Sequence, residues 1–178
     1  NFSEKEDSEG KAPLGIEFPS SEAFIQETAA AVDQFYRNQL GKPVANLYLS
    51  LPDKSSYSIY DSKAKYTVLY FYNMDCALCE AVSGDMKDIY SEFSDKGVNI
   101  LAVYTGSFKK RKEWIKYIAD NGYEWTNLID KKDSQEMFEK YNLSGVPVIY
   151  LLDEEKNTLA KDITPGVLKE ILNYLLYD

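Results

Sequence analysis

The fold of this chain is decided by one segment, Tyr66-Thr67-Val68-Leu69-Tyr70-Phe71-Tyr72-Asn73-Met74-Asp75-Cys76-Ala77-Leu78-Cys79. Its first seven residues are mostly aromatic or β-branched, which predicts a strand buried on both faces, as in a sheet covered by helices. Residues 77–93 carry apolar side chains at helical spacing. The two cysteines of the chain therefore stand where a core strand ends and a helix begins.

This placement of the cysteine pair indicates thiol–disulfide exchange. Cys76 and Cys79 lie three residues apart on the first helical turn, a spacing that allows a disulfide. The N–H groups and partial positive charge at a helix N-terminus stabilise a thiolate. We expect Cys76 to be the exposed attacking sulfur and Cys79 the less accessible sulfur that resolves the mixed disulfide. The alternative is a static disulfide or two reduced core thiols.

Composition excludes several other classes of protein. The 178 residues include no histidine, which excludes Ser-His-Asp triads, Cys-His proteases and His-ligated metals. Two cysteines cannot form a four-cysteine zinc site, and Glu80 stands where a c-type haem site needs histidine. The net charge of −9 argues against binding to nucleic acids or anionic membranes. We expect no cofactor and no metal.

Three parts are predicted along the chain. Residues 1–20 are polar and charged and contain Pro13 and Pro19, which favours a disordered tail or tether. Residues 21–41 predict an N-terminal helix that packs on the domain and is stopped by Gly41, and residues 42–178 form the domain. No apolar run approaches the ~20 residues of a membrane-spanning helix. The chain starts at Asn1 without an apolar leader, so we expect a processed or trimmed form, and a membrane anchor upstream stays open.

From Val44 onward, strands and helices alternate. We expect strands at 46–51, 57–60, 66–72, 98–104, 127–129 (a short edge piece), 146–152 and 158–163. We expect helices at 77–93, 109–120 and 134–141, and a last helix that Thr164 caps and Pro165 opens. This order predicts an α/β three-layer fold, a central mixed sheet with helices on both faces.

The chain resembles the thioredoxin superfamily in two motifs. The segment quoted above looks like its active-site strand and CxxC, and residues 141–153, Tyr-Asn-Leu-Ser-Gly-Val-Pro-Val-Ile-Tyr-Leu-Leu-Asp, look like its cis-proline loop and following strand. The resemblance implies a thioredoxin-like fold in which the Val146–Pro147 bond is cis and faces Cys76. It also implies that Gly145, Val146 and Pro147 bind the substrate, with the Val146 backbone pairing with an incoming peptide.

Residues 42–178 are most similar to the TlpA/ResA-like, AhpC/TSA-related branch of that superfamily. The extended region before the active-site strand and the insertion between Val98 and Tyr141 carry this likeness. The branch contains exported bacterial thiol–disulfide oxidoreductases, often lipid-anchored and frequent in Bacteroidetes. It implies a periplasmic or cell-envelope location, protein disulfide substrates and an upstream redox partner. We expect a monomer, because no dimerisation segment is visible, which also discourages a disulfide isomerase.

The sequence departs from the family pattern at three positions near the cysteines. Asp75 replaces the usual tryptophan, Tyr70 replaces the buried acid of thioredoxin, and Asn73 replaces the peroxiredoxin threonine, which argues against peroxidase work. A copper chaperone is also disfavoured, because its CxxxC and histidine are missing.

We take Asp75, Glu80 and Tyr70 as tuning residues of the pair. Asp75 and Glu80 flank the cysteines, and no basic residue lies between 66 and 86. Negative charge opposes the thiolate and stabilises the disulfide. This predicts a reductant whose reduction potential is nearer that of thioredoxin, ~−270 mV, than that of a strong periplasmic oxidant, ~−120 mV. A measured reduction potential above about −160 mV would contradict this prediction.

Other clusters have plainer interpretations. Residues 109–112 are basic and indicate a solvated helix face rather than a partner or nucleic-acid patch. Trp114, Tyr123 and Trp125 are expected in the core rather than at the border of the site. The acids Asp130, Asp133 and Glu136 are expected to be solvated or to cap turns rather than to bind a cation. The leading function is reduction of protein disulfides, and the alternative is a non-enzymatic binding domain with a stable disulfide.

Overall fold

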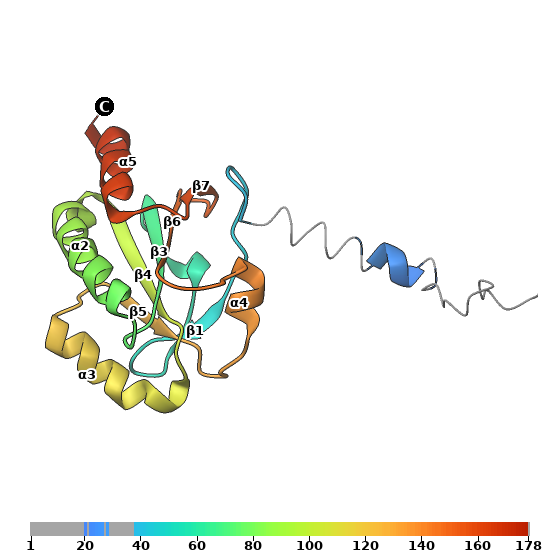
Figure 1. The fold of residues 1–178 in the computed structure, drawn as a ribbon. Helices are drawn as coiled ribbons and strands as arrows, with labels where there is room; N and C mark the ends of the chain where they lie inside the picture. Colours follow the sequence, from blue (N-terminus) through green and yellow to red (C-terminus); the bar gives the residue numbers. More distant parts are fainter. Residues whose placement is uncertain (1–19, 21, 27, 29–37, 178) are drawn as a thin grey trace, which may run out of the picture. The chain divides into compact units, whose positions relative to one another are not determined.

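The computed structural model describes residues 20, 22–26, 28 and 38–177 (Figure 1). It divides the chain into two units, Asn1–Tyr36 and Arg37–Asp178. In the first unit, residues 22–26 and 28 are helical, within the predicted N-terminal helix. The predicted end of that helix is wrong, because residues 38–40 are not helical and Leu40 forms a β-bridge with Thr158. The predicted tail, apart from Ser20, lies outside the described residues, and the packing of the helix stays a prediction.

The second unit is built on a seven-stranded mixed sheet with the order β2-β1-β5-β4-β3-β6-β7. Its strands are β1 (Tyr48–Ser50), β2 (Ser56–Ser58), β3 (Tyr66–Tyr72), β4 (Val98–Tyr104), β5 (Thr126–Ile129), β6 (Val148–Leu152) and β7 (Thr158–Lys161). Strands β3, β4 and β5 are parallel, whereas β6 runs antiparallel to β3. The α-helices are α2 (Ala77–Phe93), α3 (Arg111–Asn121), α4 (Glu136–Tyr141) and α5 (Pro165–Tyr177). Three short 3₁₀ helices are η1 (Ile59–Asp61), η2 (Ser94–Lys96) and η3 (Phe108–Lys110).

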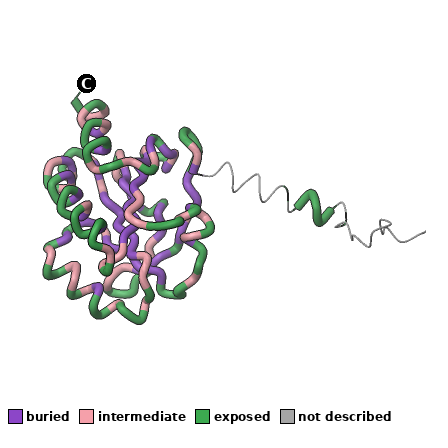
Figure 2. The backbone as a smooth tube through the Cα atoms, in the orientation of Figure 1, coloured by how far each residue is buried: buried purple, intermediate pink, exposed green. Residues whose placement is uncertain are grey.

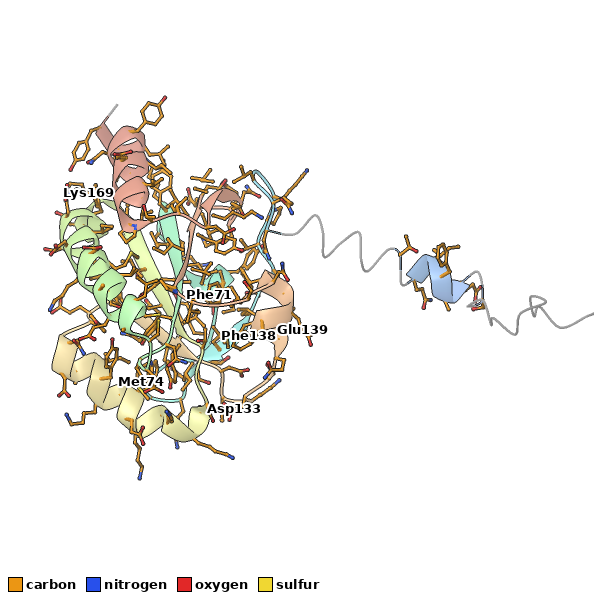
Figure 3. All side chains as sticks on the ribbon, in the orientation of Figure 1. Phe71, Met74, Asp133, Phe138, Glu139 and Lys169 are labelled. Atoms are coloured by element: carbon orange, nitrogen blue, oxygen red, sulfur yellow. The ribbon has the colours of Figure 1, made fainter. Side chains whose placement is uncertain are left out.

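Helices cover both faces of the sheet, as predicted. Figure 1 shows α2, α3 and α5 on one side of β3 and β4 and α4 on the other. Alternate residues of β3 enter the two resulting cores: Tyr70 packs with α2, α3 and α5, and Phe71 packs with α4. In Figure 3, Phe71 and Phe138 lie on the side that α4 covers. Figure 2 accordingly shows the central strands buried and the outer helix surfaces exposed. A strand buried on both faces explains why its sequence is apolar at nearly every position.

One strand lies elsewhere than the sequence indicated. The predicted edge piece at 127–129 belongs to β5, which lies inside the sheet between β4 and β1. The β1–β2 hairpin adds to its outer side through the pairing of Ser50 with Ile129. A short apolar run does not show whether a second strand will pair with its outer edge, because strand pairing is decided by the tertiary structure.

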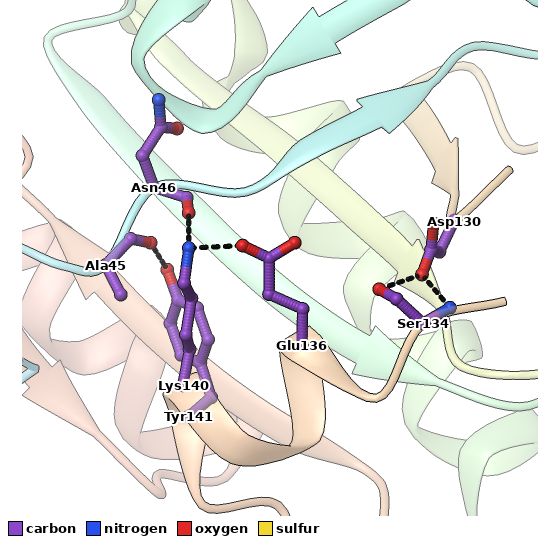
Figure 4. Close-up of polar contacts among 7 residues, drawn as sticks. All are labelled: Ala45, Asn46, Asp130, Ser134, Glu136, Lys140 and Tyr141. Atoms are coloured by element: carbon purple, nitrogen blue, oxygen red, sulfur yellow. Dashed lines mark hydrogen bonds and ion pairs between the residues drawn. The ribbon is translucent and has the colours of Figure 1, made fainter. Parts of the chain in front are cut away.

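Helix α4 is fixed to the segment before β1 by polar contacts (Figure 4). Tyr141 donates a 2.5 Å hydrogen bond to the carbonyl of Ala45, and Lys140 donates to the carbonyl of Asn46 at 3.0 Å. Lys140 also pairs with Glu136 at 2.5 Å. Asp130 closes the turn before this helix, because it accepts from Ser134 through both the N–H and the hydroxyl. This agrees with the capping interpretation for Asp130, whereas Glu136 is instead paired with Lys140.

The register of the central strands brings three loops together. Tyr72, at the end of β3, pairs with Tyr104, at the end of β4, and Phe71 pairs with Val148, at the start of β6. The segments that follow Tyr72 and Tyr104 and the segment that precedes Val148 therefore meet at one edge of the sheet. Both cysteines and Pro147 belong to these segments.

Candidate active site

Cys76 is the N-cap residue of α2. Its sulfur accepts a hydrogen bond from the N–H of Cys79 at 3.2 Å, and its backbone is extended, with φ −110° and ψ 111°. The preceding turn is closed by Asn73, whose side-chain oxygen accepts from the N–H of Asp75 at 3.0 Å. Because Cys76 caps the helix, its sulfur lies where unsatisfied N–H groups favour negative charge.

The two sulfurs differ in accessibility, as exchange requires. Both cysteines are free thiols; Cys76 is partly exposed, whereas Cys79 is fully buried. Burial, reinforced by the hydrogen bond with Cys76, raises the pKa of Cys79 to about 12. Cys79 is therefore a neutral thiol at physiological pH.

This asymmetry predicts selective alkylation. We expect iodoacetamide to modify Cys76 alone in the folded reduced protein, up to about pH 10, because Cys79 stays protonated and buried below its raised pKa. Mass spectrometry of the product should show one adduct on Cys76. Protein unfolded in guanidinium serves as control and should take up two adducts. Similar reaction rates of both thiols in the folded protein would contradict the prediction.

The proline loop faces Cys76. The Val146–Pro147 peptide bond is cis, and the thiol of Cys76 points to the carbonyl oxygen of Val146 at 3.7 Å. Gly145 has a negative φ and open space where a Cβ would stand, so its backbone does not require glycine.

An apolar groove of about 500 Å³ begins beside the cysteine pair. Its wall on α2 includes Leu78, the residue between the cysteines, which is 63% exposed. Further lining residues are Val82, Gly145, Val146, Pro147, Ile163, Thr164 and Pro165. The three predicted substrate residues thus lie together next to Cys76. The apolar groove itself is not visible in the sequence, since it joins three segments that are distant along the chain.

Tyr70 contacts the backbone of Cys79. Its hydroxyl donates to the carbonyl of Cys79 at 3.1 Å and exchanges a 2.9 Å hydrogen bond with Ser83. Both side chains are fully buried, and burial raises the pKa of Tyr70 far above its usual value. Sequence reasoning missed Ser83, although its position four residues after Cys79 places it on the same helix face.

The two acidic residues predicted to tune the pair, Asp75 and Glu80, differ in their surroundings. Glu80 is exposed, and its N–H donates to the carbonyl of Cys76 at 3.1 Å. Asp75 forms a 2.7 Å ion pair with Lys110, the last residue of η3. Lys110 is exposed, as expected for a solvated basic face at 109–112, but it is also paired with Asp75. Arg111 departs from that expectation, because it is half-buried and donates to the carbonyl of Pro52. No local pattern links Lys110 to Asp75, because 35 residues separate them.

The aromatic residues weighed for the site lie in the core. Trp114, Tyr123 and Trp125 are buried, and Tyr123 stacks on Trp125 with ring centroids 4.5 Å apart. Within the described part of the chain, no group of three or more Cys, Asp or Glu side chains could hold a metal ion.

Comparisons with known proteins show which family the chain is similar to. The family model described as the AhpC/TSA family matches residues 40–160. The thiol-disulfide oxidoreductase ResA of Geobacillus thermodenitrificans is 28% identical over 145 residues, which cover 82% of this chain and 75% of the relative. The protein of the same name from Bacillus anthracis is 23% identical over 137 residues, 77% of each chain.

Solved structures show the same fold. A thioredoxin-like protein from Bacteroides caccae superposes with a TM-score of 0.71 at 25% identity over 93% of this chain, which spans only 58% of that protein. The thioredoxin domain of a thiol-disulfide oxidoreductase from Bacteroides vulgatus gives 0.70 at 25% identity, over 78% of this chain and 98% of that domain. The predicted thioredoxin-like α/β fold is confirmed.

Proposed function

Because the chain belongs to the AhpC/TSA family and resembles thioredoxin-like thiol-disulfide oxidoreductases, we propose that its cysteine pair reduces disulfides of other proteins. The observation that carries this proposal is the arrangement of the two thiols. Cys76 is partly exposed at a helix N-terminus and Cys79 is buried one turn deeper. A purely structural pair needs no such difference in accessibility.

The proposed reaction takes two steps. The Cys76 thiolate attacks a substrate disulfide, forms a mixed disulfide and releases the first substrate thiolate. Cys79 then attacks the Cys76 sulfur, which closes the Cys76–Cys79 disulfide and breaks the bond to the substrate. The proton of Cys79 leaves with the second substrate sulfur. Two electrons have passed to the substrate, and an upstream redox partner of the dithiol type must return them.

The groove beside Cys76 suits an extended polypeptide. Gly145, Val146 and Pro147 line it, and so does the exposed side chain of Leu78. We assign these residues to substrate binding, with apolar side chains of the substrate entering the groove and its backbone running along the proline loop. Burial of apolar surface favours such a complex.

A cell-envelope location accords with this activity, since protein disulfides persist in oxidising compartments. Throughout the described part of the chain, no helix combines the length and apolar character needed to cross a bilayer. We also propose a lipid anchor upstream of Asn1 and a monomeric state. Membrane fractionation of the native protein tests the anchor, and light scattering tests the monomeric state.

Reduction of insulin by the protein, with dithiothreitol as electron source, tests the proposed function. We expect turnover above the dithiothreitol background and a reversible two-electron titration against glutathione. Absence of turnover, together with a Cys76–Cys79 disulfide that resists dithiothreitol, would instead establish a binding domain with a structural disulfide.

Tyr70 is proposed to hold Cys79 in place for the second step. We expect Tyr70→Phe to slow closure of the Cys76–Cys79 disulfide, because the hydrogen bond to the Cys79 carbonyl is lost. The free energy of unfolding should fall by about 1 kcal/mol. Acid quenching and mass spectrometry follow the closure, and denaturant titration gives the stability.

Tyr72→Phe is the matched control for this variant. Tyr72 lies on the same strand and face and is buried, but the hydrogen bond of its hydroxyl is with Trp114 of α3, from which it accepts at 2.8 Å. It should lose a similar amount of stability and keep the rate of closure. Equal rates of closure in the two variants would remove Tyr70 from the mechanism.

A further inference from the structure

A basic residue from a distant part of the chain is paired with the residue that precedes Cys76. Lys110 places its Nζ 2.7 Å from Oδ2 of Asp75, the residue directly before Cys76. The side chains are 46% and 61% exposed, so both remain open to an approaching substrate.

The segment that carries Lys110 is fixed to the end of β3. Thr105 donates to the carbonyl of Tyr72 from its N–H at 2.8 Å and from its hydroxyl at 3.1 Å. Asp133 accepts hydrogen bonds from the N–H of Phe108 and the hydroxyl of Ser107. In Figure 3, Asp133 lies beside the start of this segment. Lys110 therefore reaches Asp75 from a supported turn.

The segment also lies closely on the core. A Cβ at Gly106 would come within 2.1 Å of the Tyr104 hydroxyl, so the backbone here rests on the Tyr104 ring. That hydroxyl is buried and has no hydrogen-bond partner among the described residues. Such close packing leaves the turn little room to move away from the active-site loop.

The charges around Lys110 are mainly acidic. The pKa of Lys110 is raised, chiefly by the hydrogen bond with Asp75 and by the negative charge of Asp75. The negative charge of Glu113 contributes in the same direction. Asp133 lies close enough to act on Tyr104 as well. Lys110 is therefore a stable cation that offsets the negative charge next to Cys76.

We propose that Lys110 is a positioning residue that favours the Cys76 thiolate by neutralising Asp75, an inference that rests on the proposed function. A carboxylate beside a thiol opposes loss of the thiol proton, and a paired cation removes most of that opposition. Without Lys110, the negative charge of Asp75 would act in full on the cysteine pair and would keep its reduction potential low, as predicted from the sequence. With it, the thiolate and hence the dithiol form gain stability, and the reduction potential rises.

Alkylation of Cys76 in the reduced protein tests this proposal, since only the thiolate reacts. At pH 7 we expect Lys110→Gln to slow the reaction about two- to fivefold, the range for an exposed ion pair, and to make the reduction potential more negative. Asp75→Asn should act in the opposite direction on both readouts. Lys110→Arg should restore the wild-type rate, because it keeps the charge.

An ion pair on α3, the helix that follows Lys110, gives the control. Lys116 and Asp120 pair on the exposed surface of α3. Lys116→Gln and Asp120→Asn change the net charge equally and should leave both readouts unchanged. If Lys110→Gln behaves like Lys116→Gln, the proposal is overturned. Should the wild-type protein show no reversible dithiol titration, the proposed function fails, while the alkylation rates still report on Lys110.

Discussion

Cys76→Ser should reduce insulin no faster than dithiothreitol does alone. A serine hydroxyl does not ionise at physiological pH and cannot attack a disulfide, so the first step is lost completely. The fold should persist, because serine is a favourable N-cap residue and its oxygen can accept from the N–H of Cys79 as the sulfur does. Turbidity of reduced insulin gives the activity, and circular dichroism confirms the fold.

Cys79→Ser should separate the two steps of the reaction. The variant keeps the attacking thiolate but cannot release the substrate, so a mixed disulfide on Cys76 should accumulate to one equivalent. Non-reducing electrophoresis and mass spectrometry detect it, and the same variant traps physiological partners in a cell extract. Cys76→Ser is the matched control and should trap nothing. A mixed disulfide on Cys79 in that control would reverse the assigned roles.

Trp114→Ala should produce the largest loss of stability. Trp114 is fully buried on α3, stacks on Tyr104 with centroids 6.0 Å apart, and donates to the Tyr72 hydroxyl at 2.8 Å. Its removal leaves a cavity and an unpaired buried hydroxyl, so we expect the free energy of unfolding to fall by about 3–5 kcal/mol. Urea titration followed by circular dichroism measures this loss.

Two further variants secure the interpretation of Trp114. Trp114→Phe keeps most of the apolar volume and should lose clearly less stability than alanine, which gives a readable result even if Trp114→Ala does not fold. Lys112→Ala, on the exposed face of the same helix, should change stability by less than about 0.5 kcal/mol. A loss below about 1 kcal/mol in Trp114→Ala would show that α3 is not held by this residue.

Patterns within one segment predicted their elements well. The bounds of β3, α2 and β4 agree with the expected ranges 66–72, 77–93 and 98–104. Thr164 accepts from the N–H of Val167 at 3.4 Å, as expected for the cap of α5. In each case the information is local, because side-chain period and capping chemistry act within a few residues.

Features that depend on distant partners could not be predicted in this way. The pairing of β5 with β1, the bridge from Leu40 to Thr158 and the ion pair of Lys110 with Asp75 all join residues far apart in the chain. The charge near the cysteines could not be predicted from residues 66–86 for the same reason, since Lys110 lies outside that range.

The amino-acid order alone determined where the two cysteine sulfurs lie, because a core strand that leads into a helix is specified by adjacent residues. It also determined the family likeness, through the cysteine pair and the Val146–Pro147 motif. Folding in three dimensions decided which groups surround those sulfurs: the buried hydroxyls of Tyr70 and Ser83, the apolar groove and the cation of Lys110. The physical reason is that electrostatic and packing energies depend on distance through space, and only the packed sheet and helices set those distances.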